Sequence, residues 1–219
     1  MAAPVSAPDE RVASGACVFL QGGIPLRKNL SVQYLTRIAV LTALASILFL
    51  IEIPVVAFYK LDLSNLPVLL GAFSMGPVPG LIILLLKSLI GMLHSSSMYV
   101  GELADFIMGA AFVLPAALIY RRHKTRNTAL IGMAVGTVVM IVVAVLVNWK
   151  IMIPFYMTAY GMPMEAVVGM ATKAVPFVDT EWKLLLCVTA PFNLLKGVVL
   201  SSLTLVLYKH LSPLLHVHR

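Results

Sequence analysis

Two strongly polar side chains, Asn193 and Lys196, interrupt an apolar run near the C-terminus that is otherwise typical of a membrane helix. Residues three apart lie on one face of a helix, so the amide and the ammonium point into the same space. A charge at the centre of a spanning helix costs roughly 2.5–3.5 kcal/mol on insertion scales. Either a polar ligand or an internal acidic partner must offset that cost. We therefore interpret the pair as a candidate binding site, with an ion pair from Lys196 to Glu102 or Asp105 as the alternative.

Further polar residues are expected at a similar depth, in the outer half or centre of their spans. They are Asp62, Glu102, Asp105 and Asn148. Because unpaired polar groups that face lipid are very costly, we expect these side chains to converge inward. Pro191 has no N–H to donate to the carbonyl of Cys187, so it should kink the last helix just before Asn193 and widen a cavity there.

Two other charged residues receive a structural interpretation. Lys87 lies in mid-span without polar neighbours at helical spacing, so we expect it to form a structural salt bridge. Glu52 stands at the edge of the first apolar run, where we expect it to be solvated.

The composition places the chain in a lipid bilayer. Hydrophobic residues make up 60% of it and charged residues only 11%, and the mean hydropathy is +0.98. A soluble domain of this length would need far more charge to cover its surface. A spanning helix needs about 20 mostly apolar residues, so 219 residues hold about six spans with short loops. The predicted fold is an all-α membrane protein with six transmembrane helices.

The apolar runs give the expected boundaries. The six predicted spans are about 37–57, 66–74, 81–93, 100–120, a fifth from about 129 to near 150, and 184–208. Residues 1–36 are predicted to be a disordered cytoplasmic tail, 37–208 the transmembrane domain, and 209–219 a second cytoplasmic tail.

The net charge of +7 is distributed unevenly along the chain. If the chain crosses six times, the basic residues before the first span, between the fourth and fifth, and after the last all fall on one side. They are Arg27, Lys28, Arg37, Arg121, Arg122, Lys124, Arg126, Lys209 and Arg219. This asymmetry is the positive-inside pattern, which predicts that both termini are cytoplasmic. The basicity therefore sets orientation and does not indicate a nucleic-acid-binding protein.

Several chemical motifs are absent from the sequence. It has no phosphate-binding loop of the type G-x-x-x-x-G-K-[ST], no H-E-x-x-H, no G-x-S-x-G and no Cys/His cluster with metal-ligand spacing. We therefore expect neither an enzyme nor a metal site. A membrane chain that transports a solute without its own ATPase must use an ion gradient or the ATPase of a partner protein.

Several segments resemble a known transporter family. Residues 61–73, with Gly76-Pro77 and Gly80, resemble the first loop and second helix of substrate-binding (S) components of energy-coupling factor (ECF) transporters. The riboflavin-specific, RibU-type members resemble this chain at 146–149, 153–156 and 190–198, and residues 101–106 are similar to the start of the family's fourth helix. The resemblance covers about residues 37 to 208.

The resemblance implies a six-helix riboflavin-binding subunit in the bacterial plasma membrane. It would work with a transmembrane coupling protein and two cytoplasmic ATPases, and it would need no cofactor, since riboflavin is the transported ligand. In the family the flavin sits near the outer face, under the first loop and among helices four to six. The substrate-binding set expected here is Leu61, Asp62, Ser64, Glu102, Asp105, Asn148, Tyr156, Asn193 and Lys196. Ala39 and Ala43 form a small-x-x-x-small face that resembles the family's docking surface for the coupling protein.

The chemistry of a flavin agrees with these residue types. Its pyrimidine-dione edge alternates carbonyl, N–H and carbonyl, which suits Asn amides that donate and accept and a Lys that only donates. Ser64, Glu102 and Asp105 suit the ribityl hydroxyls. A pterin or a thiamine-like ring satisfies much of the same list, so an S component for thiamine, folate or pantothenate stays open. A gradient-driven carrier, or a membrane enzyme that uses Lys196 or Glu102 for acid–base work, also stays open.

Overall fold

The computed structural model describes residues 32–56, 59–95, 98–173 and 175–215, with side chains described as far as residue 207. The predictions for residues 1–31 and 216–219 lie outside the described residues. Residues 36–219 form the compact unit that carries the candidate site.

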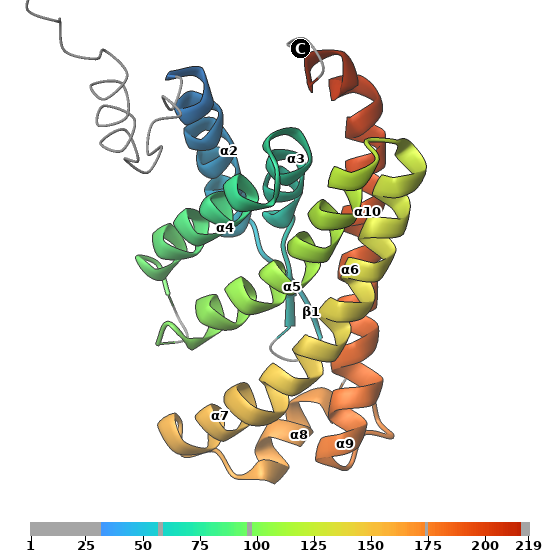
Figure 1. Cartoon of the computed structure of the whole chain (residues 1–219). Coiled ribbons are helices and arrows are strands. Elements are labelled where there is room, and N and C mark those ends of the chain that lie inside the picture. Colours follow the sequence, from blue (N-terminus) through green and yellow to red (C-terminus); the bar gives the residue numbers. More distant parts are fainter. Residues whose placement is uncertain (1–31, 57–58, 96–97, 174, 216–219) are drawn as a thin grey trace, which may run out of the picture. The chain divides into compact units, whose positions relative to one another are not determined.

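Helices dominate the described part of the chain (Figure 1). The long helices are α2 (Val32–Leu50), α3 (Asn65–Met75), α4 (Pro77–Met92), α5 (Val100–Arg122), α6 (Arg126–Val147) and α10 (Ala190–Leu215). The short helices are α7 (Ile153–Ala159), α8 (Met164–Thr172) and α9 (Glu181–Leu184). Two π-helical segments, η1 (Asn148–Met152) and η2 (Leu185–Thr189), continue α6 and precede α10, and strands β1 (Ile53–Val56) and β2 (Tyr59–Leu61) form an antiparallel pair.

Four continuous helical stretches in the described residues are long and apolar enough to cross a membrane. They are Val32–Leu50, Val100–Arg122, Arg126–Ala159 and Glu181–Leu207. The predicted second and third spans correspond to the shorter apolar helices α3 and α4. The described part of the chain is therefore mostly helical with four apolar spans, and the β1–β2 hairpin is the departure from the predicted all-α fold.

The boundaries of the first predicted span, 37–57, are wrong. Helix α2 begins at Val32 and ends at Leu50, and Ile53–Val56 forms strand β1. Pro54 has no N–H for a helix and the residues around it are β-branched, so this sequence favours an extended edge strand. The chain consequently leaves the bundle earlier and builds a hairpin in which Pro54 pairs with Lys60.

Two further boundaries differ from the prediction. The third span begins at Pro77 instead of 81, because proline fits the first turn of a helix, where its missing N–H has no intrahelical partner. The last helix continues to Leu215, so the residues predicted to begin a tail at 209 are helical.

Close helix contacts hold α6 between α5 and α10. A Cβ added at Gly132 would lie 2.7 Å from the carbonyl oxygen of Ala116, and one added at Gly136 would lie 2.4 Å from that of Phe112. On the other side, a Cβ at Gly197 would lie 2.5 Å from Thr137 Cγ2. Small residues let helix backbones approach closely in membranes. They fix the relative positions of the three helices that carry most of the candidate site.

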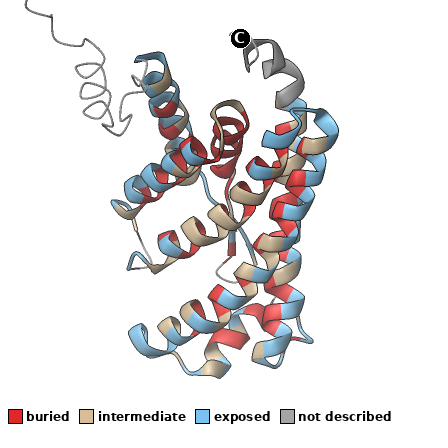
Figure 2. Ribbon diagram, in the orientation of Figure 1, coloured by how far each residue is buried: buried red, intermediate tan, exposed pale blue. Residues whose placement is uncertain are grey.

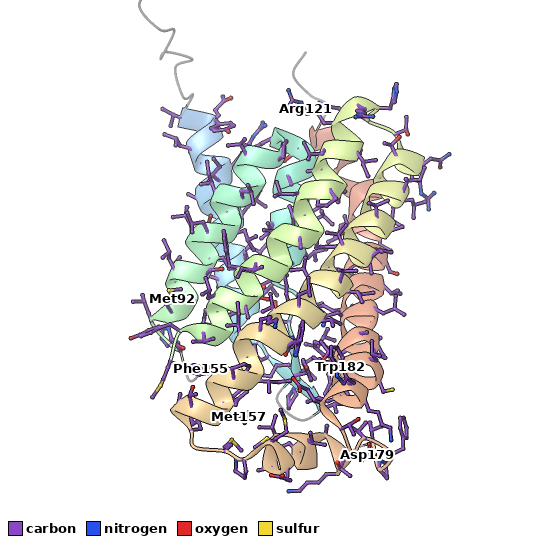
Figure 3. All side chains as sticks on the ribbon, turned by 60° about the horizontal axis from the view of Figure 1, so that its bottom comes forward. Met92, Arg121, Phe155, Met157, Asp179 and Trp182 are labelled. Carbon is purple, nitrogen blue, oxygen red and sulfur yellow. The ribbon has the colours of Figure 1, made fainter. Side chains whose placement is uncertain are left out.

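Burial follows the helix faces (Figure 2), with buried residues turned toward neighbouring helices and large apolar side chains such as Val138 and Ile131 exposed. Figure 3 shows that Arg121 lies at one end of the helices, whereas Met157 and Asp179 lie at the opposite end, near α7, α8 and α9. The end at which Arg121 lies is called the basic end below. The opposite end is called the hairpin end, because the chain that forms strands β1 and β2 leaves α2 toward it.

Candidate functional site

A cavity of about 290 Å³ lies toward the hairpin end, close to the lower limit of about 300 Å³ for small-molecule sites. The buried residues of its polar wall are Asp62, Glu102, Asp105, Asn148, Asn193 and Lys196. Its aromatic wall consists of Phe49, Tyr59, Tyr156, Tyr160 and Phe192. Seven of the nine residues predicted to bind substrate therefore line one space, although they come from four separate parts of the chain.

The two π-helical segments place the asparagines on this wall. Asn148 is the first residue of η1, and Asn193 stands four residues after the end of η2. Each amide donates to the carbonyl four residues earlier, Asn148 Nδ2 to Ala144 at 2.8 Å and Asn193 Nδ2 to Thr189 at 2.9 Å. Wide π turns inside α-helices occur frequently at functional sites. The η2 segment ends two residues before Pro191, where the sequence predicts a kink.

Buried charges form a continuous network beside the cavity. Lys196 Nζ donates to Asp62 Oδ2 at 2.8 Å and to Asp105 Oδ1 at 3.1 Å. The second oxygen of Asp105 accepts from Lys87 Nζ at 2.7 Å. The network contains two lysines and two aspartates, so its formal charge is zero. Pairing of this kind offsets the cost of burying each charge.

The two lysines differ in how many of their ammonium N–H groups form hydrogen bonds within the described residues. An ammonium has three N–H donors. Lys87 donates to Ser64 Oγ at 2.8 Å, to Asn65 Oδ1 at 3.1 Å and to Asp105, is fully buried and does not line the cavity. Lys196 lines the cavity and makes only its two bonds to aspartates among the described residues, which leaves one N–H for a ligand.

Both interpretations of Lys196 are therefore compatible with its surroundings. The predicted ion pair to Asp105 is present, whereas Glu102 accepts a hydrogen bond from Ser95 Oγ at 2.8 Å instead. The salt bridge predicted for Lys87 is also present, and its acidic partner is Asp105.

The asparagines differ in a similar way. Asn193 Oδ1 has no hydrogen-bond donor among the described residues and belongs to a side chain on the cavity wall. Asn148 Oδ1 accepts from the hydroxyl of Tyr59 at 3.1 Å. Asn193 therefore offers a free acceptor, whereas Asn148 offers the second N–H of its amide group.

Tyr59 joins three parts of the site, and the sequence analysis missed it. Its hydroxyl bonds to Asn148 and to Thr189 Oγ1, and its ring lies 5.1 Å from that of Phe192 between centroids. Burial raises the pKa of the Tyr59 hydroxyl far above its usual value, so it stays protonated at physiological pH. Strand β2 is thereby tied to both π segments.

Two of the predicted substrate-binding residues do not line the cavity. Ser64 is fully buried and bonds to Asp62 and Lys87, so its hydroxyl is used inside the charge network. Leu61 packs against the hydrophobic cluster that includes Val167 and Leu184. The predicted docking residues Ala39 and Ala43 lie away from the cavity, exposed on α2.

Two charged residues at the cavity were not identified from the sequence. Glu52, expected to be solvated, forms an ion pair with Lys60, and both line the cavity while remaining about one third to one half exposed. Their proximity depends on the β1–β2 hairpin, which the sequence analysis interpreted as helix followed by loop. Among the described residues, no three His, Cys, Asp or Glu side chains gather to hold a metal ion.

Comparison with known proteins gives consistent results. A family model described as the substrate-specific component of ECF transporters matches residues 33–208. The riboflavin transporter RibU of Staphylococcus aureus (strain TCH60) is 31% identical over 195 residues, covering 86% of this chain and 97% of that protein. The riboflavin transporter FmnP of Bacillus subtilis (strain 168) is 23% identical over 196 residues, covering 87% and 97%. A solved structure of the S component of a bacterial ECF transporter superposes with a TM-score of 0.65 at 32% identity, covering 83% of this chain and 96% of that one.

Proposed function

The chain belongs to the substrate-specific (S) components of ECF transporters, and we propose that riboflavin is the ligand it captures, in the cavity at the hairpin end. It is a transport subunit and not an enzyme. The S component binds the vitamin, and its ECF partners supply the energy for uptake. The riboflavin transporters of S. aureus and B. subtilis align over most of their length with this chain, which supports the same substrate here.

The observation that carries the proposal is the set of unused hydrogen-bonding groups on the cavity wall. Lys196 offers an N–H, Asn193 offers Oδ1 as an acceptor, and the amide of Asn148 offers an N–H. Two donors and one acceptor match in number and kind the two carbonyls and one N–H of the pyrimidine-dione edge. Aromatic side chains that line the same cavity suit the flat face of the isoalloxazine ring.

The remaining polar wall suits the ribityl chain. Glu102 and Asp105 carry carboxylate oxygens that accept hydrogen bonds from hydroxyls. In this proposal Leu61 and Ser64 act behind the cavity, the first in packing and the second through Asp62 and Lys87.

The proposed topology is six spans with both termini in the cytoplasm, in the bacterial plasma membrane. Helices α3 and α4 serve as the second and third spans, and the turn between them faces the cytoplasm. The basic residues between α5 and α6 support this orientation through the positive-inside rule. The domain limits proposed from the sequence are kept, except that the last helix extends past 208.

Purification in detergent tests the substrate directly. The chain should leave the column yellow, and riboflavin added to stripped protein should lose fluorescence as it binds. A colourless protein that leaves riboflavin fluorescence unchanged would contradict the proposal. Competition by thiamine, folate or pantothenate at equal concentration would instead indicate an S component for that vitamin.

Uptake in cells tests the mechanism. Riboflavin accumulation should require co-expression of the coupling protein and its two ATPases. Accumulation without them, abolished by dissipating the proton or sodium gradient, would indicate a gradient-driven carrier.

We propose that Ala39 and Ala43, exposed on α2, form the docking surface for the coupling protein. Ala39→Trp should abolish uptake and leave riboflavin affinity unchanged, because the residue is remote from the cavity lining. Val138→Trp is the matched control, since Val138 is 61% exposed on α6. Equal loss of uptake in both variants would contradict a specific docking role.

A further inference from the structure

A second cavity, of about 310 Å³, lies at the basic end, where the turn between α3 and α4 meets the end of α5. Its floor is apolar and includes the buried residues Phe73, Pro77 and Tyr120, and the rings of Phe73 and Tyr120 lie 4.5 Å apart between centroids. Its rim carries two cations, Arg121 and Lys124. Figure 3 shows Arg121 at this end, far from the labelled residues of the hairpin end.

No acidic side chain in the described residues neutralises these two cations. The lining contains neither Asp nor Glu, and neither Arg121 nor Lys124 forms an ion pair within the described ranges. The chain has nine acidic residues. Two of them, Asp9 and Glu10, lie outside the described residues, and none of the other seven lines this cavity. The described part of the chain thus leaves the positive charge of the rim to be balanced from outside.

The shape and charge of the cavity match one class of molecule. A guanidinium binds phosphate with two parallel N–H bonds, and an ammonium adds a second positive charge beside it. The apolar floor suits the glycerol and first methylene groups of a lipid. Basic pockets between helices on the cytoplasmic side of membrane proteins bind anionic lipid headgroups.

We propose that the cavity at the basic end binds the phosphodiester headgroup of an anionic membrane lipid such as phosphatidylglycerol. Arg121 and Lys124 hold the phosphate, and the floor formed by α3, α4 and α5 contacts the glycerol. The site rests on the proposed orientation, which places this end at the cytoplasmic leaflet. Lipid bound there would hold the α3–α4 turn against the end of α5.

The test compares two double variants that remove the same charge. Arg121→Gln with Lys124→Gln removes the rim, whereas Arg122→Gln with Arg126→Gln removes two cations of the same basic segment that do not line the cavity. Each lowers the formal net charge from +7 to +5. The probe is phosphatidylglycerol in mixed micelles, with phosphatidylcholine as the neutral lipid, and retention is measured by native mass spectrometry.

We expect the unmodified chain and the Arg122/Arg126 variant to retain one phosphatidylglycerol and little phosphatidylcholine. The Arg121/Lys124 variant should bind phosphatidylglycerol at least about tenfold more weakly than that control. Equal weakening of both variants would overturn the proposal, because the basic surface as a whole would then attract the lipid. Inorganic phosphate that displaces the lipid at millimolar concentration would overturn it in favour of a soluble phosphate ligand.

Two further measurements guard the interpretation. Asp9→Asn with Glu10→Gln, made in the full chain, should leave lipid retention unchanged, and a strong increase would show that the N-terminal acids occupy the cavity instead. Riboflavin binding serves as the folding control in every variant, since none of these residues lines the other cavity. If the unmodified chain retains lipid but binds no riboflavin, the lipid site is supported and the proposed substrate is refuted.

Discussion

The two cavities have nearly the same volume, about 290 and 310 Å³. They differ in whether acidic side chains of the described residues pair with their cations. At the hairpin end, Lys87 and Lys196 are buried and each is paired with an aspartate. At the basic end, Arg121 and Lys124 are exposed and have no acidic partner among the described residues. A charge buried within a bundle must be neutralised by the fold, whereas one near the membrane surface is neutralised by water, ions or headgroups.

This difference bears on the ligand that each cavity suits. The buried network at the hairpin end has a formal charge of zero, and the wall offers single donors and acceptors, which favours a neutral polar heterocycle. The basic end offers unbalanced positive charge, which favours an anion. The comparison can be tested by removing charges from either side or by adding charge to the ligand.

The largest expected effect is the loss of stability in Lys87→Met. The variant leaves the Asp105 carboxylate with one partner and removes the donor to Ser64 and Asn65. Breaking a buried pair from one side typically costs about 3–5 kcal/mol. The thermal midpoint in detergent should therefore fall strongly.

Lys183→Met provides the matched control. Lys183 pairs with Asp179 four residues earlier, and its hydrogen bond holds the pKa of Asp179 below the usual value. The side chains of Lys183 and Asp179 are 47% and 64% exposed, so solvent screens the pair and the thermal midpoint should not change. Equal losses in the two variants would show that burial does not set the value of these ion pairs.

Lys196→Met is expected to weaken binding and also to lower stability, because buried Asp62 loses its one cationic partner among the described residues. It removes the N–H that the cavity wall offers, which should weaken riboflavin by about 1.5–3 kcal/mol, the range for a hydrogen bond to a charged group. Fluorescence titration of the folded fraction measures the dissociation constant. Lys60→Met is the control, because Lys60 also lines the cavity but is exposed and paired with Glu52. An unchanged constant in Lys196→Met would remove Lys196 from the site.

Flavin mononucleotide probes the charge of the cavity from the ligand's side. Four acids line the cavity, Glu52, Asp62, Glu102 and Asp105, against Lys60 and Lys196, with Lys87 behind them, so the formal sum is three minus four, or −1. A phosphate adds a charge of about −1.5 to −2. Flavin mononucleotide should therefore bind about tenfold more weakly than riboflavin. Glu102→Gln should reduce the difference in affinity between riboflavin and flavin mononucleotide. Equal affinities for the two ligands in the unmodified chain would contradict this account.

The sequence predicted the membrane class and most of the cavity wall because both follow from local rules. Apolar runs of spanning length identify the helices, and polar residues within such runs must turn inward. That reasoning alone brought Asn193 and Lys196 to one face, and it was sufficient for Asp105 and Asn148 as well. The choice of riboflavin over other heterocycles depended on the family resemblance.

Apart from the Lys196–Asp105 ion pair, which was predicted as an alternative to ligand binding, the partners of those residues were not predictable in the same way. Tyr59 meets Asn148 across 89 positions of sequence and Thr189 across 130, and Lys196 meets Asp62 across 134. No helical or strand period relates residues at such separations. The hairpin that delivers Tyr59 was missed because Ile53–Val56 continues an apolar run, and only Pro54 marks the change from helix to strand.

The smallest expected effect is that of Tyr59→Phe, and it asks whether the network at the hairpin end orients the ligand-binding groups or only stabilises the fold. The ring keeps its contact with Phe192, but Asn148 Oδ1 loses its donor, so only the bond from Nδ2 to Ala144 still orients the amide. The hydroxyl's bonds to Asn148 and Thr189 are both lost. If the Asn148 amide then loses its bond to the flavin, riboflavin binding should weaken by about 0.5–1.5 kcal/mol, the range for one neutral hydrogen bond. Tyr99→Phe, at a residue 61% exposed, should change nothing. If Tyr59→Phe lowers the thermal midpoint and leaves the dissociation constant unchanged, the hydroxyl stabilises the hairpin without orienting Asn148. The wall would then owe its donor and acceptor pattern to the π segments alone.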